Sequence, residues 1–146
     1  MLEDVQQTIG YLIVQICKAH RGCAEDSLNA VGLHAGQEMF LMHLCQQDGQ
    51  TQSQLAERMG VQPPTVNKML SRMESNGLVT RGTDSEDSRV SRVYLTEKSR
   101  ALESDIQQAW ADLEARTTAN LTVDERVLLR RLLLQVVANL SEEGQP

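Results

Sequence analysis

Apolar residues recur at helical spacing through most of this chain. From Val5 to about residue 24 they fall three or four positions apart, and the run from Met39 to Cys45 is apolar on nearly every side. The first pattern predicts an amphipathic helix with one buried stripe. The second predicts a helix that packs on several sides and ends near Asp48. The chain is therefore expected to be mainly helical.

Two shorter helices are predicted between residues 51 and 77. Thr51 followed by Gln54 has the spacing of a capping box, and Gly60 can adopt the left-handed conformation that ends a helix. Pro63 and Pro64 suit the first turn of the next helix, because N–H groups there have no partner within the helix. The two helices are joined by a tight turn.

The second of these helices has one apolar and one polar face. Its apolar face carries Val66, Leu70 and Met73, and its polar positions, with the entrance residue, are Gln62, Thr65, Asn67, Lys68, Ser71 and Arg72. A helix that reads a major groove needs short polar and basic side chains near its N-terminus. Asn and Gln can pair with adenine, Lys with guanine or phosphate, and the N–H groups of a helix start favour phosphate.

A hairpin is predicted to follow. Residues 78–81 and 92–95 read as strands, the second with Val93 and Leu95 pointing inward, and the polar segment GTDSEDSRVS connects them. Two helices followed by a hairpin form a winged helix-turn-helix. The hairpin tip can reach a minor groove or the DNA backbone, where arginine suits best. Arg89 and Arg92 are the candidates.

The last third of the chain predicts two further helices. Thr96 caps a long helix whose inner face includes Leu102, Ile106, Trp110 and Leu113. Thr122 and Glu125 form another capping box, which opens a final helix with the apolar residues Leu128, Leu129, Leu132, Leu133, Val136, Val137 and Leu140. That helix has more apolar surface than one stripe requires. With the first helix it indicates a subunit interface built from both ends of the chain.

Length and composition describe an ordinary globular protein. The 146 residues are about one domain's length, 40% of them are hydrophobic and 23% are charged. The sequence has no segment of about twenty apolar residues and no basic leader followed by an apolar run. We therefore expect a soluble, cytoplasmic protein without a membrane partner.

The charge distribution is uneven. The chain has a net charge of −6, yet residues 51–100 carry eight basic and six acidic side chains, a net charge of +2. Contact with phosphates needs local Lys and Arg rather than a basic total. A mildly basic central segment in an acidic chain fits a protein that contacts DNA with one face, although an evenly solvated surface gives the same signal.

The cysteines and histidines form no recognisable metal or disulfide motif. The three cysteines, Cys17, Cys23 and Cys45, include no CxxC pair and are expected to be reduced core residues. The histidines His20, His34 and His43 include no HxxxH pair, so no metal site and no cofactor are expected. The sequence also lacks a glycine-rich phosphate loop, a GxSxG elbow and an HExxH motif, which argues against an enzyme.

Three stretches lie in order around the predicted helix-turn-helix. They are VGLHAGQEMFLMHL at 31–44, TQSQLAERMGVQPPTVNKMLSRMESNGLVTR at 51–81 and DSEDSRVSRVYLTEKS at 84–99. Together they resemble the MarR family of transcriptional regulators, over essentially the whole chain. The resemblance includes the acidic and arginine positions of the family's wing and the hydrophobic-x-Leu-Thr step after it.

The resemblance implies a fold and a function. The fold is mainly α with a small β wing, in one domain spanning 1–146. Residues 1–32 and 100–141 would form the dimerisation helices, and residues 33–99 the winged helix-turn-helix lobe. The function implied is that of a homodimer that binds a pseudo-palindromic double-stranded operator, usually as a repressor released by a small ligand or an oxidant.

Carried over position by position, the resemblance places the groove-reading helix on residues 63–74. With the residues named above, the expected DNA-binding set is Gln62, Pro63, Pro64, Thr65, Asn67, Lys68, Ser71, Arg72, Asp84, Asp87, Arg89 and Arg92. In the family, the wing acids hold the wing arginine in position. Two positions depart from the family pattern: Ser88 replaces the first arginine of the wing pair, and Ser99 replaces a glycine. Of these, the change at Ser99 is expected to matter little.

The resemblance also implies an effector pocket between the dimer helices and the DNA-binding lobe. From their helix positions, the residues expected to line it are Tyr11, His34, Gln37, Phe40 and Trp110. Two alternatives stay open. One is a winged-helix module that binds protein without specific DNA binding, and the other is a redox-responsive regulator that uses a cysteine near Lys18 and Arg21.

Overall fold

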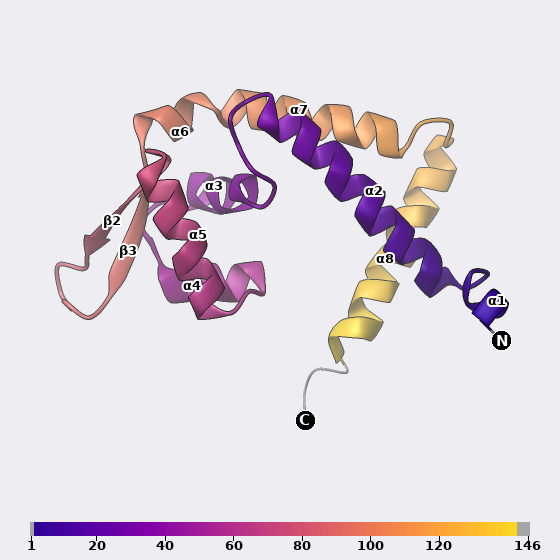
Figure 1. The fold of residues 1–146 in the computed structure, drawn as a ribbon, viewed down its shortest axis with the longest axis horizontal. Helices are drawn as coiled ribbons and strands as arrows, with labels where there is room; N and C mark the ends of the chain where they lie inside the picture. The colour runs from indigo at the N-terminus through magenta and orange to yellow at the C-terminus, as the bar shows by residue number, and fades with distance from the viewer. Residues whose placement is uncertain (1, 143–146) are drawn as a thin grey trace. The chain divides into compact units, whose positions relative to one another are not determined.

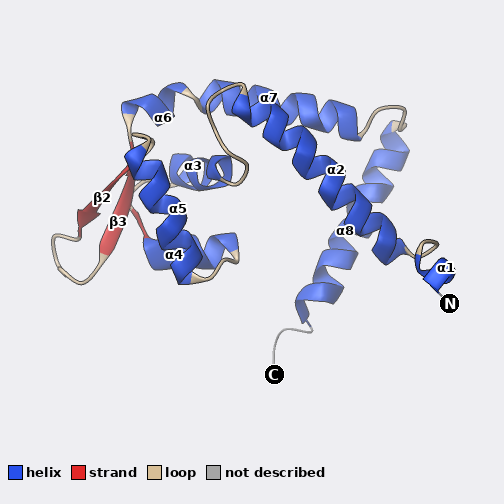
Figure 2. Ribbon diagram, in the orientation of Figure 1, coloured by secondary structure: helices blue, strands red, loops and turns tan. Residues whose placement is uncertain are grey.

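The computed structural model describes residues 2–142, which form eight helices and three short strands (Figures 1 and 2). In chain order they are α1 (Leu2–Val5), α2 (Ile9–Asn29), α3 (Gln37–Gln46), β1 (Gln50–Thr51), α4 (Gln52–Met59), α5 (Pro63–Ser75), β2 (Val79–Thr83), β3 (Ser91–Leu95), α6 (Glu97–Ala101), α7 (Glu103–Thr117) and α8 (Val123–Glu142). The expected mainly helical fold with a small β wing is confirmed.

The chain forms two compact units. The first extends to Ala111 and includes the helix-turn-helix and the wing, and the second begins at Asp112 and includes α8. None of the helices in residues 2–142 has the length and apolar character needed to cross a membrane.

The local signals that begin and end the central helices are confirmed. Thr51 and Gln54 form a capping box at the start of α4, with each side chain accepting from the other residue's backbone N–H. Gly60 ends α4 in the left-handed conformation, at φ +61°, and α5 begins at Pro63. These features depend on residues only a few positions apart, which is why the sequence predicts them well.

The core of the first unit lies beneath the two central helices and the sheet. Val66, Leu70 and Met73 of α5 are all at most 1% exposed, as the helical spacing predicts. They belong to one cluster with the other large buried side chains, including Leu33, Phe40, Leu41, Leu44, Leu55, Leu78, Val79 and Val93. Residues 33–95 supply almost all of this cluster, so α5 and the strands rest on one shared core.

The sheet has a strand that the sequence did not predict. β1 pairs with β3, which also pairs with β2, and all pairs are antiparallel. The inward side chains of β3 are Val93 and Leu95, as expected. Because the β2–β3 pairing extends to Thr83 opposite Ser91, the connecting loop is only residues 84–90 and is shorter than expected.

Three helix boundaries differ from the prediction. The first long helix begins at Ile9, where Thr8 Oγ1 accepts from the Tyr11 N–H at 3.1 Å, and it continues to Asn29. The helix capped by Thr96 is short, because at Leu102 the chain makes a tighter turn in which its N–H donates to Ser99 O at 3.1 Å. The expected single helix is therefore α6 followed by α7.

The α2 and α8 helices each expose large apolar side chains. On α2 these are Ile9, Leu12, Val14 and Ile16. On α8 they are Val123, Val127, Leu128, Leu129, Leu132, Leu133, Leu134, Val137 and Leu140. Such continuous apolar surface is unusual for a monomer in water.

Candidate nucleic-acid interface

Helix α5 presents a polar face away from its buried stripe. Gln62, Thr65, Asn67, Lys68 and Arg72 are exposed, while Ser71 is half-buried. Within the described part of the chain, the side chains of Lys68 and Arg72 make no hydrogen bond or ion pair. Two cations on one helix are therefore free to meet phosphates or base edges.

The start of α5 differs from an ordinary anion-binding helix terminus. Its first two residues, Pro63 and Pro64, have no N–H group, and the N–H groups of Thr65 and Val66 both donate to Gln62 O, at 3.0 and 3.1 Å. The expectation that amide groups here attract phosphate is wrong for these residues. The two exposed proline rings instead present apolar surface, which suits contact with a thymine methyl group.

Arg81 of β2 reaches across to the polar face of α5. Its Nη1 donates to Asn67 Oδ1 at 2.9 Å, its Nη2 donates to Ser71 Oγ at 3.0 Å, and the same Nη2 lies 3.3 Å from Glu74 Oε1. The Arg81 backbone N–H donates to Glu74 Oε2 at 3.1 Å. This residue was absent from the sequence-based site.

A sequence signal for this network did exist. Asn67, Ser71 and Glu74 lie at i, i+4 and i+7, and so form one polar stripe along α5. The strand that follows the helix carries Arg81. The spacing alone, however, does not reveal that β2 packs beside this stripe.

The hairpin of β2 and β3 projects beside α5 as an arm (Figure 1). Where the wing loop begins, Arg92 donates from Nε to Asp84 Oδ2 at 2.6 Å and from Nη1 to Gly49 O at 2.8 Å. Arg92 therefore fastens the wing to the turn before β1. The sequence predicts Arg92 as a DNA contact, and in the structure its Nε and Nη1 groups already have partners within the lobe.

The wing acids shape the loop backbone and do not hold Arg89. Asp84 accepts the Glu86 N–H at 2.8 Å, and Asp87 accepts the Arg89 backbone N–H at 2.9 Å. The Glu86 N–H, followed by the Arg92 guanidinium, lowers the pKa of Asp84 below its ordinary value. Among the described residues, no acid pairs with the Arg89 side chain, so the restraint implied by the resemblance is absent.

Arg89 is exposed near the tip of the wing, and so is Ser88 beside it. Because the Arg89 guanidinium has no partner among residues 2–142, it is free for a partner molecule. Of the two wing arginines in the expected set, Arg89 is the one whose positive charge has no partner among the described residues.

Ser99, the second departure from the family pattern, is 1% exposed. Its Oγ donates to Leu78 O, a carbonyl that also accepts the Thr96 backbone N–H at 3.4 Å. The sequence did not predict this buried hydrogen bond, which lies where the helix-turn-helix joins the wing.

The five residues expected to line an effector pocket lie in three different places. Phe40 and Trp110 line a cleft of about 410 Å³. His34 and Gln37 line a separate groove beside Arg72, and Tyr11 lies on α2. The structure therefore brings together only two of the five.

The 410 Å³ cleft lies within the first unit and is largely apolar. Its lining includes His20 and Arg21 of α2, Glu38 of α3, Met59 at the end of α4, Val61 after it, and Thr65 and Met69 of α5. Glu38 is 4% exposed and accepts the Gly36 N–H at 2.7 Å. Burial raises the pKa of the Glu38 carboxyl above its ordinary value.

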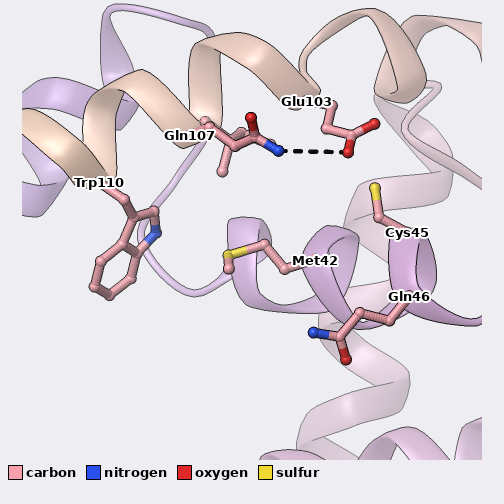
Figure 3. Close-up of a pocket in the computed structure, with 7 residues that line it drawn as sticks. Met42, Cys45, Gln46, Glu103, Gln107 and Trp110 are labelled. Carbon is pink, nitrogen blue, oxygen red and sulfur yellow. Dashed lines mark hydrogen bonds between the residues drawn. The ribbon is translucent and has the colours of Figure 1, made fainter.

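A second cleft of about 310 Å³ lies between α3 and α7 (Figure 3). Met42, Cys45 and Trp110 line it with Glu103, whose carboxylate lies 3.5 Å from Gln107 Nε2. Partial desolvation by the walls of the cleft raises the pKa of the Cys45 thiol, and the Glu103 charge raises it further. Because the thiolate is the reactive form, this environment makes Cys45 less reactive.

The cysteines are not core residues, contrary to expectation. Cys17 and Cys45 are exposed and Cys23 is half-buried. Cys17 lies on the apolar stripe of α2, and that stripe is itself exposed, so its position in the pattern did not predict burial. Among residues 2–142, no three histidines, cysteines or acids gather in a way that could hold a metal ion.

This fold is similar to that of known proteins. The sequence pattern of the MarR family matches residues 33–91, which contain α3, the helix-turn-helix and the whole wing loop. A mutant MarR from E. coli, crystallised with operator DNA, is 28% identical to this chain, with a TM-score of 0.81 over 88% of this chain and 92% of that one. Residues 33–91 of the chain therefore match the MarR family pattern, and the structure is similar to that of the operator-bound MarR.

Other solved structures agree with the MarR fold. MepR of S. aureus, solved as a DNA complex, is 25% identical with a TM-score of 0.84, over 90% of this chain and 98% of that one. The transcriptional regulator SlyA shares the fold at 24% identity and a TM-score of 0.83, over 92% of this chain and 95% of that one. The chain thus has the fold of these transcriptional regulators.

Proposed function

We propose that this protein is a sequence-specific regulator of transcription that binds double-stranded DNA. The observation that carries the proposal is the free positive charge on the helix-turn-helix and the wing: Lys68 and Arg72 on α5 and Arg89 on the wing. Each is exposed and has no internal partner among the described residues. The operator-bound MarR and the MepR–DNA complex support the same role.

The residues proposed to contact DNA are narrower than the sequence-based set. Lys68, Arg72 and Arg89 supply charge, Gln62 and Thr65 are polar groups at the start of the reading helix, and Pro63 and Pro64 supply apolar contact. Asn67 is also proposed to contact DNA, but with fewer of its hydrogen-bonding groups available. Four residues of that set are assigned a structural role instead, because their side chains form hydrogen bonds inside the lobe: Ser71, Asp84, Asp87 and Arg92.

A homodimer is part of the proposal. The exposed apolar side chains of α2 and α8 would be covered by a second copy of the chain. Two copies related by a two-fold axis would present two α5 helices to a pseudo-palindromic operator, with half-sites spaced by about 34–36 Å, one turn of DNA. The dimerisation segments remain 1–32 and 100–141, and the DNA-binding lobe 33–99.

We further propose repression that is relieved by a small, largely apolar effector in the 410 Å³ cleft. Thr65 and Met69 of the reading helix form part of that cleft's wall. An occupant would therefore contact α5 directly. A ligand shifts the balance between two conformations only through its different affinity for them, and a contact with a moving helix supplies such a difference.

The test of DNA binding is selection from a pool of random duplex DNA. Purified protein is incubated with the pool at two salt concentrations, and the retained duplexes are sequenced. We expect an inverted repeat whose binding weakens strongly as salt rises, because phosphate contacts release counterions. The double variant Lys68→Ala, Arg72→Ala is the matched protein that should retain no sequence.

The opposite outcome is also informative. If no sequence is enriched and binding is negligible even at low salt, the proposal fails. The protein-interaction module would then be the better interpretation, with the same exposed basic groups facing a protein surface.

A further inference from the structure

The amide of Asn67 lies in a fixed orientation on the reading face. Arginine has only hydrogen-bond donors, so the Asn67 atom facing Arg81 Nη1 at 2.9 Å must be the oxygen, Oδ1. The Gln52 Nε2 group lies 3.4 Å from the same oxygen. Both lone pairs of Oδ1 thus have donors, and only the Nδ2 hydrogens of Asn67 are free.

Ser71 is occupied in the same way. Its Oγ donates to Asn67 O at 2.9 Å and accepts from Arg81 Nη2 at 3.0 Å. A hydroxyl has a single proton, and here that proton is already used within the helix. Ser71 is therefore an anchor for Arg81 and not a donor to DNA.

Glu74 completes the attachment of Arg81. One carboxylate oxygen accepts the Arg81 backbone N–H and the other lies close to its guanidinium. The Arg81 side chain is only 22% exposed. Held at both backbone and side chain, Arg81 forms a fixed brace between β2 and α5.

We infer that Arg81 is a positioning residue that restricts Asn67 to donating hydrogen bonds to DNA. An asparagine that recognises adenine bidentately accepts from the adenine N6 amino group and donates to N7. With Oδ1 occupied, Asn67 does not accept from N6. It selects major-groove acceptors, namely purine N7, guanine O6 or thymine O4, and it does not read the adenine amino group.

This inference rests on the proposed DNA binding, but its first test needs no DNA. The side-chain amide of Asn67 is assigned by nitrogen-15 NMR in the full-length protein, and its order parameter is measured. We expect a rigid amide in the wild type and a mobile one in Arg81→Met. Arg58→Met, which removes an exposed arginine that binds Gln47 on another surface, is the matched control and should change nothing.

The lysine variant separates geometry from charge. Arg81→Lys keeps the positive charge but lacks the planar fork that bridges Asn67 and Ser71. Partial or no restoration of the rigid amide supports a brace. Full restoration by lysine, or an amide that is mobile in the wild type, overturns the inference. Thermal unfolding of each variant confirms that the lobe is folded.

The second test uses modified operators. The position read by Asn67 is the base pair whose preference disappears in Asn67→Ala. If that position holds adenine, 7-deazaadenine removes the N7 acceptor and purine removes the N6 amino group. For the wild type we expect a roughly five- to tenfold loss with the first, typical of one hydrogen bond, and no loss with the second. If it holds guanine, 7-deazaguanine serves in the same way.

The Arg81→Met protein should behave differently. Once Oδ1 is released, Asn67 can accept from adenine N6, so adenine becomes favoured and removal of its amino group becomes costly. A wild type already sensitive to the amino group would overturn the inference. If the wild type enriches no operator, the proposed function fails, and the NMR measurement alone decides whether Arg81 braces Asn67.

Discussion

Arg92 and Asp84 close the start of the wing loop, with Nε and Oδ2 only 2.6 Å apart. The same guanidinium reaches Gly49 O, so the wing is fastened both to itself and to the turn that precedes β1. This pair explains how a short hairpin with a polar tip keeps a defined direction beside α5.

The first prediction concerns the pH dependence of this closure. Asp84 has a lowered pKa because it accepts the Glu86 N–H and the Arg92 guanidinium. At a pH above 3.8, the ordinary pKa of the Asp84 carboxyl, the ionised group stabilises the folded protein. This stabilisation is lost as the pH falls from 3.8 through the lower pKa of the folded state. We expect wild type to exceed Asp84→Asn in stability at neutral pH, with the difference vanishing in strong acid.

Urea unfolding of both proteins between pH 2 and pH 7 measures this difference, with Glu57→Gln as a control at an exposed acid. A gap between wild type and Asp84→Asn that persists unchanged at the lowest pH would contradict the proposed ion pair.

The second prediction concerns the Gly49 turn. Gly49 has φ +71°, and a Cβ added there would lie 2.9 Å from Tyr94 Cε1. Gly49→Ala should therefore reduce the free energy of unfolding by about 1–2 kcal/mol, the cost of a left-handed non-glycine residue. Urea unfolding measures the loss.

Gly22 provides the matched control for that substitution. It lies inside α2, and an added Cβ would meet nothing within 4 Å. Gly22→Ala should stabilise the protein, by up to about 1 kcal/mol, because alanine is the better helix former. Equal effects at the two glycines would show that the turn geometry is not the cause.

The third prediction concerns Glu38 in the wall of the 410 Å³ cleft. Burial raises its pKa above 4.5. A raised carboxyl pKa means that ionisation of Glu38 lowers the free energy of unfolding. The stability of the wild type relative to Glu38→Gln should therefore fall as the pH rises above 4.5, and should level off above the pKa of the folded state. Unfolding curves from pH 4 to pH 8 test this, and a flat difference across that range would refute it.

The fourth prediction concerns the proposed DNA contacts. Lys68→Ala or Arg89→Ala should weaken operator binding by about 1–3 kcal/mol if the residue makes a specific contact. Lys18→Ala removes the same charge from an exposed position on α2 and should have a smaller effect. Fluorescence anisotropy with the selected operator measures all three, and unchanged affinity in a folded protein removes that residue from the contact set.

The fifth prediction concerns assembly. Leu132 on α8 is 44% exposed, so Leu132→Glu should leave the lobe folded while placing a charge on the proposed dimer surface. We expect sedimentation to give a dimer for wild type and a shift toward monomer for the variant. Leu132→Met is the matched apolar control. A wild type that sediments as a monomer would refute the dimer.

Much of the fold was predictable because its signals are local. The capping box of Thr51 and Gln54, the start of α5 at Pro63 and the alternation of Val93 with Tyr94 each depend on neighbours within a few residues. The exposed cations Lys68 and Arg89 were predictable for the same reason, since helix and hairpin periodicity decides which side chains face outward.

The rest depended on which distant segments meet. The bond from Arg92 to Gly49 joins residues 43 positions apart, and that from Arg81 to Asn67 joins β2 to α5 across the turn at Gly77. The strand β1 exists only because β3 lies beside it. The expected effector residues likewise separated into three surfaces once the helices packed.

By itself, then, the sequence determined the elements, their order and the basic, polar face of the reading helix, because these follow from short-range periodicity and capping. Tertiary structure alone decided that the Arg92 guanidinium bonds to Asp84 and Gly49, and that Asn67 Oδ1 accepts from Arg81. The physical reason is that a polar side chain's chemistry depends on which donors and acceptors its neighbours have already satisfied, and those neighbours are brought together only by packing.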